Sequence, residues 1–303
     1  MADVDEIPGL DPAHHPMRLL EQLTAWMDAN DEHEHEPDPV DAPPKDRAVR
    51  KVSAWAGSGA LADPHGYADF AHAIGLRRID LMVNEHSAWR DPRPFDTYSA
   101  DKIERFAEAV AGHGIELHLT SWLMPHADYI AKAMHDLLEL LERTGAISIL
   151  FDCEEPWTKA RRRLQYSAAA RLVRDAFAGV VIGVTGIGYA PVDKLGPICS
   201  VADYLVPQCY STSTSKQDPV DVVGKFTARW RREWPEQRVE VGLAAYRQTG
   251  IPGYTADAAM RAAFAGAQND KRSSVVIYWS LAALRKDKAA ARTVAELVAS
   301  IPA

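Results

Sequence analysis

The chain has 303 residues, 47% hydrophobic and 25% charged, which is the composition of a folded globular protein and excludes collagen-like and fully disordered classes. Its apolar runs are too short to cross a bilayer, so we expect no membrane span. The N-terminus lacks the basic start and apolar stretch of a secretory signal, and three cysteines, an odd number, fit a reduced protein. We therefore expect cytoplasmic synthesis, with export only by a route that needs no cleaved signal.

Negative charge is concentrated at the start of the chain. Residues 1–46 carry 13 of the 42 acidic residues and 2 of the 34 basic ones, a balance of −11, whereas residues 47–303 carry 29 acidic and 32 basic residues, a balance of +3. A nearly neutral body has no basic excess of the kind that binds nucleic acid, so we exclude that class of partner. The charge divides the chain into an arm, residues 1–46, and a body, residues 47–303.

The arm combines one helical pattern with an acidic linker. Apolar residues recur at helical spacing between Pro16 and Ala29: Leu19, Leu20, Leu23, Trp26 and Met27. This spacing predicts a short amphipathic helix. The Pro-rich acidic stretch that follows cannot bury enough apolar surface to fold, so it is interpreted as a linker. An exposed apolar stripe requires a partner, which is either the body or another protein.

In the body, short apolar runs rich in Val, Ile and Leu alternate with helix-like segments. The expected strands are Lys51–Ala56, Arg78–Asn84, Ile115–Trp122, Ile147–Glu154, Val180–Thr185, Tyr204–Tyr210, Val239–Tyr246 and Val275–Ser280. The expected helices are Ser99–Ala111, Ala127–Arg143, Lys159–Phe177, Val220–Trp234, Ala256–Gln268 and Asp287–Ser300. Such alternation implies parallel pairing through right-handed crossovers, and eight units in about 250 residues predict an α/β fold, a (β/α)8 TIM barrel.

A doubly wound open sheet is the alternative fold. It is disfavoured because no phosphate-binding glycine loop follows the first strand: the segment from Ala56 to Gly59 lacks the later glycine and a helix directly behind it. Gly183, Gly186 and Gly188 have the wrong spacing for a dinucleotide fingerprint, and we expect them in tight turns.

The fourth expected strand ends in a pair of carboxylates. Side chains alternate along a barrel strand, so Asp152 and Glu154 share the inward face, at the carboxyl end where barrel active sites form. Their Cβ atoms lie roughly 6–7 Å apart, which is close enough that one group stays protonated while the other is ionised. An acid beside an anion is what cleavage of a glycosidic bond requires.

Polar and aromatic side chains are expected around the same rim. Aromatic rings stack on the apolar faces of sugars, and polar groups bond to the ring substituents. The candidate substrate-binding residues are Trp55, Asn84, His118, Trp122, Glu155, Trp157, Gln208, Tyr246 and Trp279. Together with the acid pair they predict a cleft for a polysaccharide, with no cofactor and no metal.

The motifs resemble those of a known family. The sequence Asp152-Cys153-Glu154 at the end of the fourth strand resembles the D-x-E of the chitinase and endo-N-acetylglucosaminidase family, glycoside hydrolase family 18. Gln208-Cys209-Tyr210 is similar to that family's M-x-Y on strand six, and Trp279 to the tryptophan on its last strand. The resemblance implies that Glu154 is the acid, that Asp152 steadies the substrate's N-acetyl group as internal nucleophile, and that Tyr210 bonds to that group. It implies a hydrolase of peptidoglycan or chitin.

The resemblance is incomplete. The family's two further aspartates are replaced here by Ile147 and Leu150, and its strand-six methionine by Gln208. The run Phe151-Asp152-Cys153-Glu154 is also similar to the F-D-x-E of phage-type lysozymes, family 25, but Ser53 stands where those proteins carry an aspartate.

Three alternatives remain open. Glu155-Pro156 is similar to the acid/base motif of retaining barrel glycosidases, but Ala244-Ala245-Tyr246 supplies no second glutamate. A metal-dependent enzyme is the next alternative; its ligands would be Asp152, Glu154, His118 and one of His86 or Glu85. The third is a barrel that binds a glycan, or serves as a scaffold, without catalysis.

Overall fold

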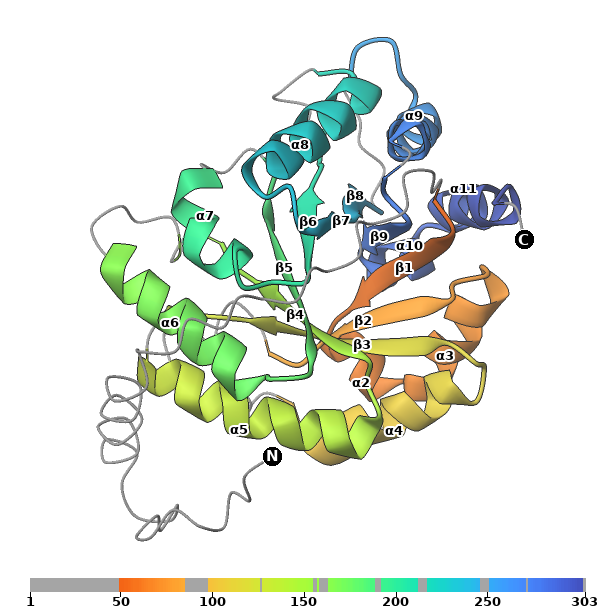
Figure 1. Cartoon of the computed structure of the whole chain (residues 1–303). Coiled ribbons are helices and arrows are strands. Elements are labelled where there is room, and N and C mark those ends of the chain that lie inside the picture. The colour runs from red at the N-terminus through yellow and green to blue at the C-terminus, as the bar shows by residue number, and fades with distance from the viewer. Residues whose placement is uncertain are drawn as a thin grey trace, which may run out of the picture.

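The computed structural model describes residues 49–84, 98–125, 127–154, 157, 163–188, 192–211, 217–245, 251–270 and 272–301. In these residues a parallel sheet closes into a barrel and helices surround it (Figure 1). The strands are β1 (Lys51–Ala56), β2 (Arg78–Met82), β3 (Glu116–Trp122), β4 (Ser148–Asp152), β5 (Val181–Ile187), β6 (Tyr204–Gln208), β7 (Arg238–Val239), β8 (Val241–Ala244) and β9 (Val275–Trp279). The helices are α2 (Ser58–Ala62), α3 (Pro64–Ala73), α4 (Ala100–Ala111), α5 (Ala127–Thr144), α6 (Arg163–Ala176), α7 (Val192–Cys199), α8 (Pro219–Glu233), α9 (Ala256–Asn269), α10 (Leu281–Lys286) and α11 (Lys288–Ala299).

The barrel closes because each position in the ring has two neighbours. β1 pairs with β2 and β9, and the ring continues through β3, β4, β5 and β6 to β8, which pairs with β9. β7 and β8 are separated only by Glu240 and share the seventh position of the ring. The predicted TIM barrel is confirmed, and the open sheet is excluded by the pairing of β5 with β6.

The sequence pattern did not predict several of the helices. Two of them, α2 and α3, lie between β1 and β2, and α7 and α10 are also additional to the expected set. The expectation that no helix lies directly behind the segment from Ala56 to Gly59 is wrong, because α2 begins inside this segment, at Ser58. A helix this short carries too few apolar residues to show a helical period.

Local hydrogen bonds fix where the surrounding helices begin. The carboxylate of Asp218 accepts from the backbone N–H of Val220 at 2.8 Å and precedes α8, and Asp287 accepts from Ala289 at 3.0 Å before α11. Such caps satisfy amide groups that have no partner inside the helix. These two caps define the first residues of α8 and α11.

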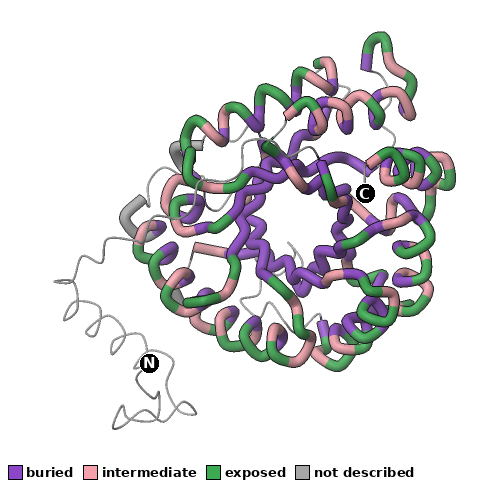
Figure 2. The backbone as a smooth tube through the Cα atoms, turned by 45° about the vertical axis from the view of Figure 1, so that its right-hand side comes forward, coloured by how far each residue is buried: buried purple, intermediate pink, exposed green. Residues whose placement is uncertain are grey.

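The core has two parts, one on each side of the barrel wall. The larger part lies between the strands and the helices, and the strands are buried along nearly their whole length (Figure 2). The smaller part fills the barrel interior and consists of Trp55, Met82, Leu150, Tyr204, Val206, Val275 and Ile277. In β1, β2, β4, β6 and β9 the residues alternate between the two parts, as expected for strands with one face inside the barrel and the other against the helices.

The arm, residues 1–46, lies outside the described residues, so the expected helix and linker and the boundary at residue 47 stay predictions. Among the helices that the structure describes, none is both long enough and apolar enough to cross a bilayer.

One glycine on β5 makes room for an aromatic ring inside the barrel. A β carbon on Gly183 would lie 2.3 Å from Cζ of Tyr204, far inside van der Waals contact. Gly183 and Gly186 are therefore strand residues rather than the turn residues expected from the sequence. The missing side chain on β5 lets the ring of Tyr204 occupy the interior.

We expect Gly183→Ala to lower the free energy of unfolding by about 1–3 kcal/mol, because the methyl group overlaps the buried Tyr204 ring. The matched control is Gly224→Ala on the exposed side of α8, where a β carbon meets nothing within 4 Å. That substitution should stabilise the protein by about 0.5–1 kcal/mol through helix propensity. Urea denaturation of the three proteins measures both effects, and equal values for the two variants would contradict the packing argument.

Candidate active site

A cleft of about 570 Å³ opens at the carboxyl ends of the strands. Its lining comes from β1, β2, β3, β4, β6 and β9 and from the segments that follow them. The lining residues are Trp55, Gly57, Ser58, Gly59, Met82, Tyr98, Trp122, Asp152, Glu154, Gln208, Tyr210, Trp279, Ser280 and Ala282. The sequence-predicted residues Asp152, Glu154, Tyr210, Trp55, Trp122, Gln208 and Trp279 are thus brought together.

The two carboxylates belong to one strand end and face one cavity. Asp152 is the last residue of β4, and Glu154 follows two residues later on the same side, whereas Phe151 and Cys153 pack in the outer core. Asp152 is 8% exposed, and its Oδ1 accepts a hydrogen bond from Nε2 of Gln208 at 3.4 Å. Burial raises the pKa of Asp152 well above its usual range, and the neighbouring Glu154 carboxylate raises it further. Asp152 therefore keeps a proton at pH values where a free aspartate has already lost it.

Aromatic side chains form the walls of the cleft. The rings of Trp55 and Trp279 lie 5.7 Å apart, centroid to centroid, at an interplanar angle of 59°. Trp55 and Trp122 are almost completely buried, whereas Trp279 is partly exposed. The peptide bond between Trp279 and Ser280 is cis. Trp279 is thus the indole with a face available to a sugar ring.

Asn84 supports the wall instead of lining it. Its Oδ1 accepts from the backbone N–H of Trp122 at 2.6 Å, and its Nδ2 donates to the backbone carbonyl of Trp122 at 3.0 Å. The side chain is fully buried. The prediction that Asn84 touches the substrate is therefore wrong: both ends of its amide are used to hold β2 against the end of β3.

Trp157 is not a cleft residue. Its indole N–H donates to the backbone carbonyl of Leu123 at 2.6 Å, its ring lies 5.7 Å from that of Tyr166, and it is completely buried in the outer core. The expectation that it stacks on substrate is wrong: β4 already ends at Asp152, so strand alternation does not extend to Trp157, whose side chain packs in the outer core.

His118 points inward, as expected, but at the opposite end of the barrel. Its Nδ1 lies 2.6 Å from Oγ of Ser148, four residues before Asp152 on β4, which corresponds to about 13 Å along the strand. The prediction that His118 lines the cleft is wrong. The same separation removes His118 from the metal ligand set proposed with Asp152 and Glu154, and the described residues contain no group of three or more His, Cys, Asp or Glu side chains able to hold a metal ion.

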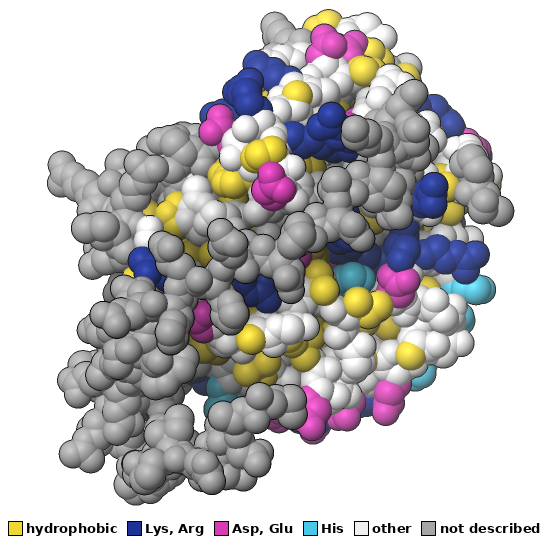
Figure 3. Space-filling model, viewed as in Figure 1, with side chains coloured by type: hydrophobic (Ala, Val, Ile, Leu, Met, Phe, Trp, Pro, Cys, Tyr) yellow, Lys and Arg dark blue, Asp and Glu magenta, His cyan; other side chains and the backbone are white. Residues whose placement is uncertain are grey.

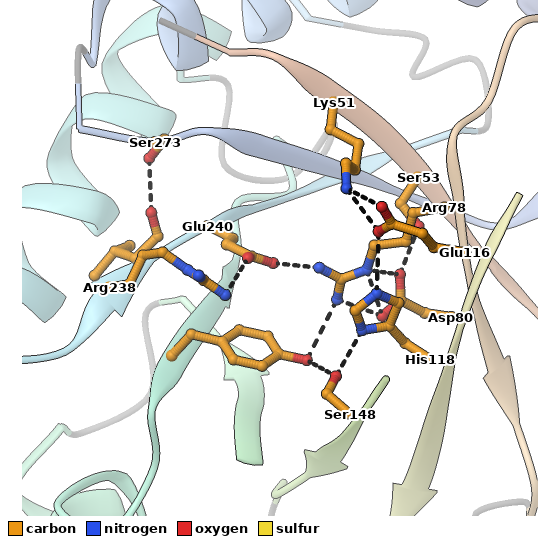
Figure 4. Close-up of polar contacts among 12 residues, drawn as sticks. Lys51, Ser53, Arg78, Asp80, Glu116, His118, Ser148, Arg238, Glu240 and Ser273 are labelled. Atoms are coloured by element: carbon orange, nitrogen blue, oxygen red, sulfur yellow. Dashed lines mark hydrogen bonds and ion pairs between the residues drawn. The ribbon is translucent and has the colours of Figure 1, made fainter. Parts of the chain in front are cut away.

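A buried polar network surrounds His118 at the amino ends of the strands (Figure 4). Arg78 lies at its centre and bonds to Asp80 at 2.6 Å, to Glu240 at 3.0 Å and to the hydroxyl of Tyr204 at 3.3 Å. The described carboxylates Asp80 and Glu240 are both completely buried, so the guanidinium between them offsets their burial. This network is structural and lies away from the cleft.

Two predicted residues, Glu155 and Tyr246, lie outside the described residues, as do Glu85 and His86. On the seventh strand, β8 ends at Ala244 beside Trp279, and Ala245 follows. In the part of the seventh strand end that the structure describes, no carboxylate faces Asp152 and Glu154.

Sequence reasoning missed several lining residues. Ser58 and Gly59 belong to α2, Tyr98 precedes α4, and Ser280 and Ala282 follow β9. Four of these residues are small and carry no chemistry that marks them in a sequence. The only signal for all five, Tyr98 included, is their position close to a strand end or a helix start.

Comparison with known proteins gives a fold and no family. No family model matches the chain, and no curated protein matches it. Solved structures that resemble it include an exo-β-1,4-mannosidase from Opitutaceae bacterium strain TAV5, with 12% identity and a TM-score of 0.61, over 87% of this chain and 62% of that one. This chain therefore spans less than two thirds of the mannosidase.

Two further structures match most of their own length. A GH18 chitinase from Cycas revoluta, solved with (GlcNAc)3, has 9% identity and a TM-score of 0.59 over 82% of this chain and 99% of that one. A GH5_18 protein from Streptomyces cattleya in complex with GlcNAc has 14% identity and a TM-score of 0.59 over 84% and 80%. The resemblance to GH18 chitinases and other glycoside hydrolase barrels is confirmed at the level of fold.

The raised pKa of Asp152 has a consequence for stability. Above the pKa of an unfolded aspartate, about 3.9, the folded chain keeps a proton that the unfolded chain has lost. Stability must therefore fall as pH rises from there toward the folded pKa, by up to about 1.4 kcal/mol per pH unit.

We expect Asp152→Asn to remove this loss, because an amide does not ionise. The free energy of unfolding of the variant, relative to the unsubstituted protein, should grow between pH 5 and pH 7. Urea denaturation at three pH values measures the difference, and a difference that does not change with pH would contradict a buried, protonated Asp152.

Proposed function

We propose that the protein is a glycoside hydrolase that cleaves a polymer containing N-acetylhexosamine, such as peptidoglycan or chitin. The observation that carries the proposal is that Asp152 and Glu154 line one cleft together with Trp279, Tyr210 and Gln208. An acid pair between an aromatic wall and hydrogen-bonding side chains matches the needs of glycosidic bond cleavage.

Glu154 is assigned the role of acid. It lies one strand step beyond Asp152, toward the mouth of the cleft, and is more exposed than Asp152. In this position a protonated Glu154 can deliver its proton to the leaving oxygen of a bound sugar. Glu154 regains its proton from the water that completes hydrolysis, when the same carboxylate acts as general base.

The side chains that face the acid pair support this substrate class. A retaining enzyme with a protein nucleophile needs a second carboxylate about 5–5.5 Å away, on the other side of the bond that is cut. Among the described residues that line the cleft, Asp152 and Glu154 are the only acids, and both come from the end of β4. A substrate that carries its own nucleophile, an acetamido group beside the reacting carbon, removes this need.

Asp152, Tyr210 and Gln208 are then assigned to the acetamido group. Protonated Asp152 can donate a hydrogen bond to the group, and the hydroxyl of Tyr210 and the amide of Gln208 complete a polar pocket around it. Trp279 is assigned to the apolar face of the same sugar ring. These roles are those that the family 18 motif implies for Asp152, Glu154 and Tyr210.

We expect Glu154→Gln to lower kcat at least about a hundredfold on a cleavable N-acetylhexosamine polymer, because an amide cannot donate the catalytic proton. Binding of the same polymer should change by less than about tenfold, since the amide fills the same space. Turnover of chitin oligomers and purified peptidoglycan, with calorimetric binding to the inactive variant, measures the two effects. Unchanged turnover on every substrate that the protein cleaves would refute the assignment.

The second candidate is a barrel that binds the same glycans without cleaving them. It is favoured by Leu150, which lies inside the barrel where the family 18 motif carries an aspartate. In that case the unsubstituted protein and Glu154→Gln would bind the polymer equally, and neither would release reducing ends. The experiment above therefore also separates the two candidates.

A further inference from the structure

The amino ends of four neighbouring strands carry an arc of basic side chains. Arg77 directly precedes β2, Arg50 precedes β1, Arg272 lies three residues before β9, and Arg238 begins β7. These strand positions are consecutive around the ring, and all four side chains are exposed. We call these residues the arginine arc. On the face shown in Figure 3, Lys and Arg side chains gather beside a histidine and several hydrophobic side chains.

Part of the positive charge of the arc is not compensated. Arg238 pairs with Glu240 at 3.0 Å, and the nearby Lys51 pairs with Glu116 at 2.6 Å. With the residues that the structure describes, Arg50, Arg77 and Arg272 form no ion pair. Three neighbouring cations without a partner repel one another and attract an acidic segment.

Beside the arc lies a depression of about 300 Å³ with an apolar edge. Arg50 and Arg238 line one side of it, and Ile147 and Val181 line another. Ile147 is 51% exposed and Val181 40%, which makes them two of the three large hydrophobic residues that are exposed in the described residues. An apolar edge next to a basic arc fits an occupant that is both apolar and acidic.

The imidazole of His118, which lines the depression, has one ring nitrogen without a hydrogen-bond partner among the described residues. Arg78 donates to the hydroxyl of Tyr204, which lies 3.0 Å from Oγ of Ser148, and that oxygen lies 2.6 Å from Nδ1 of His118. In this series of hydrogen bonds, every hydrogen finds an acceptor only if Tyr204 donates to Ser148 and Ser148 donates to Nδ1 of His118. The ring proton of His118 is then on Nε2. Nε2 is buried and has no hydrogen-bond partner among the described residues; Oε2 of Glu116 is 3.7 Å away.

One segment of this chain has the matching chemistry. Residues 31–46 carry seven acidic residues and one basic residue, and they join the body next to Arg50. Residues 16–29 carry the apolar stripe that predicts an amphipathic helix. A 16-residue linker reaches at most roughly 50 Å, so the helix is tethered within reach of the whole amino face, at an effective concentration of about millimolar.

We propose that the arm docks on the amino face of its own barrel. Its acidic linker, residues 31–46, lies along the arginine arc, and the apolar stripe of residues 16–29 covers Ile147 and Val181. The docked arm leaves the cleft open, because the cleft lies at the carboxyl ends of the strands. The proposal therefore does not depend on the proposed function.

Trypsin cleavage of the full-length protein tests the docking. The arm has two basic residues, Arg18 and Lys45, so cleavage after Arg18 reports whether residues 16–29 are covered. We expect Arg77→Gln/Arg272→Gln to accelerate this cleavage about fivefold at low ionic strength, and Ile147→Ser/Val181→Ser to do the same. Added salt should accelerate cleavage of the unsubstituted protein and have less effect on the arginine variant.

The matched control is Arg171→Gln/Arg292→Gln, which removes two exposed arginines from α6 and α11 and should leave the cleavage rate unchanged. Circular dichroism of each variant confirms that the barrel is folded. Cleavage of the unsubstituted protein as fast as that of the arginine variant would overturn the proposal, as would an equal effect of the control. Protection that disappears on tenfold dilution would also overturn it, because the arm would then occupy a second copy of the chain.

Discussion

The closed ring of strands is the constraint that positions every functional side chain. Because β5 pairs with both β4 and β6, a strand cannot slip by one residue without exchanging its inward and outward side chains against two fixed neighbours. The register pairs Asp152 with Trp122 on one side and with Thr185 on the other. Backbone hydrogen bonds along β4 therefore hold Asp152 at the mouth of the barrel. The position of Glu154, two residues further along the chain, is fixed by that of Asp152.

Buried charges are paired at the amino end of the barrel, whereas no described cation lines the cleft at its carboxyl end. At the amino end, Arg78 lies between Asp80 and Glu240, so each described buried charge has a partner of opposite sign. At the carboxyl end, the described lining of the cleft contains the carboxylates of Asp152 and Glu154 and no Lys or Arg. The burial of Asp152 is therefore not offset by a cation, and it appears as a raised pKa. An acid pair kept at this cost to stability is typical of a functional site.

Alternation along a strand was sufficient to predict the acid pair, but it does not say how far along the barrel axis a residue lies. His118 points inward as predicted, but it lies near the start of β3, in register with Asp80 on β2. Its position along the barrel axis is determined only by the pairing of strands that are distant in the sequence. Beyond the end of a strand, alternation no longer predicts the direction of a side chain, and the prediction for Trp157 was wrong for that reason. Helix α7 was missed because Gly196 and Pro197 disfavour a helix locally, while the burial of Leu195, Ile198 and Cys199 stabilises one.

The departures from the family 18 motif bear on whether the cleft can be catalytic. Leu150 lies two residues below Asp152 on the same inward face, next to Gly183, where that motif carries an acid. An apolar side chain there supplies neither a hydrogen-bond partner nor a like charge to Asp152. Burial is the larger of the two causes that raise the pKa of Asp152, and the Glu154 carboxylate is the smaller. The replacement leaves both carboxylates in the lining of the cleft: Glu154, which we propose as the acid, and Asp152, which we propose binds the acetamido group.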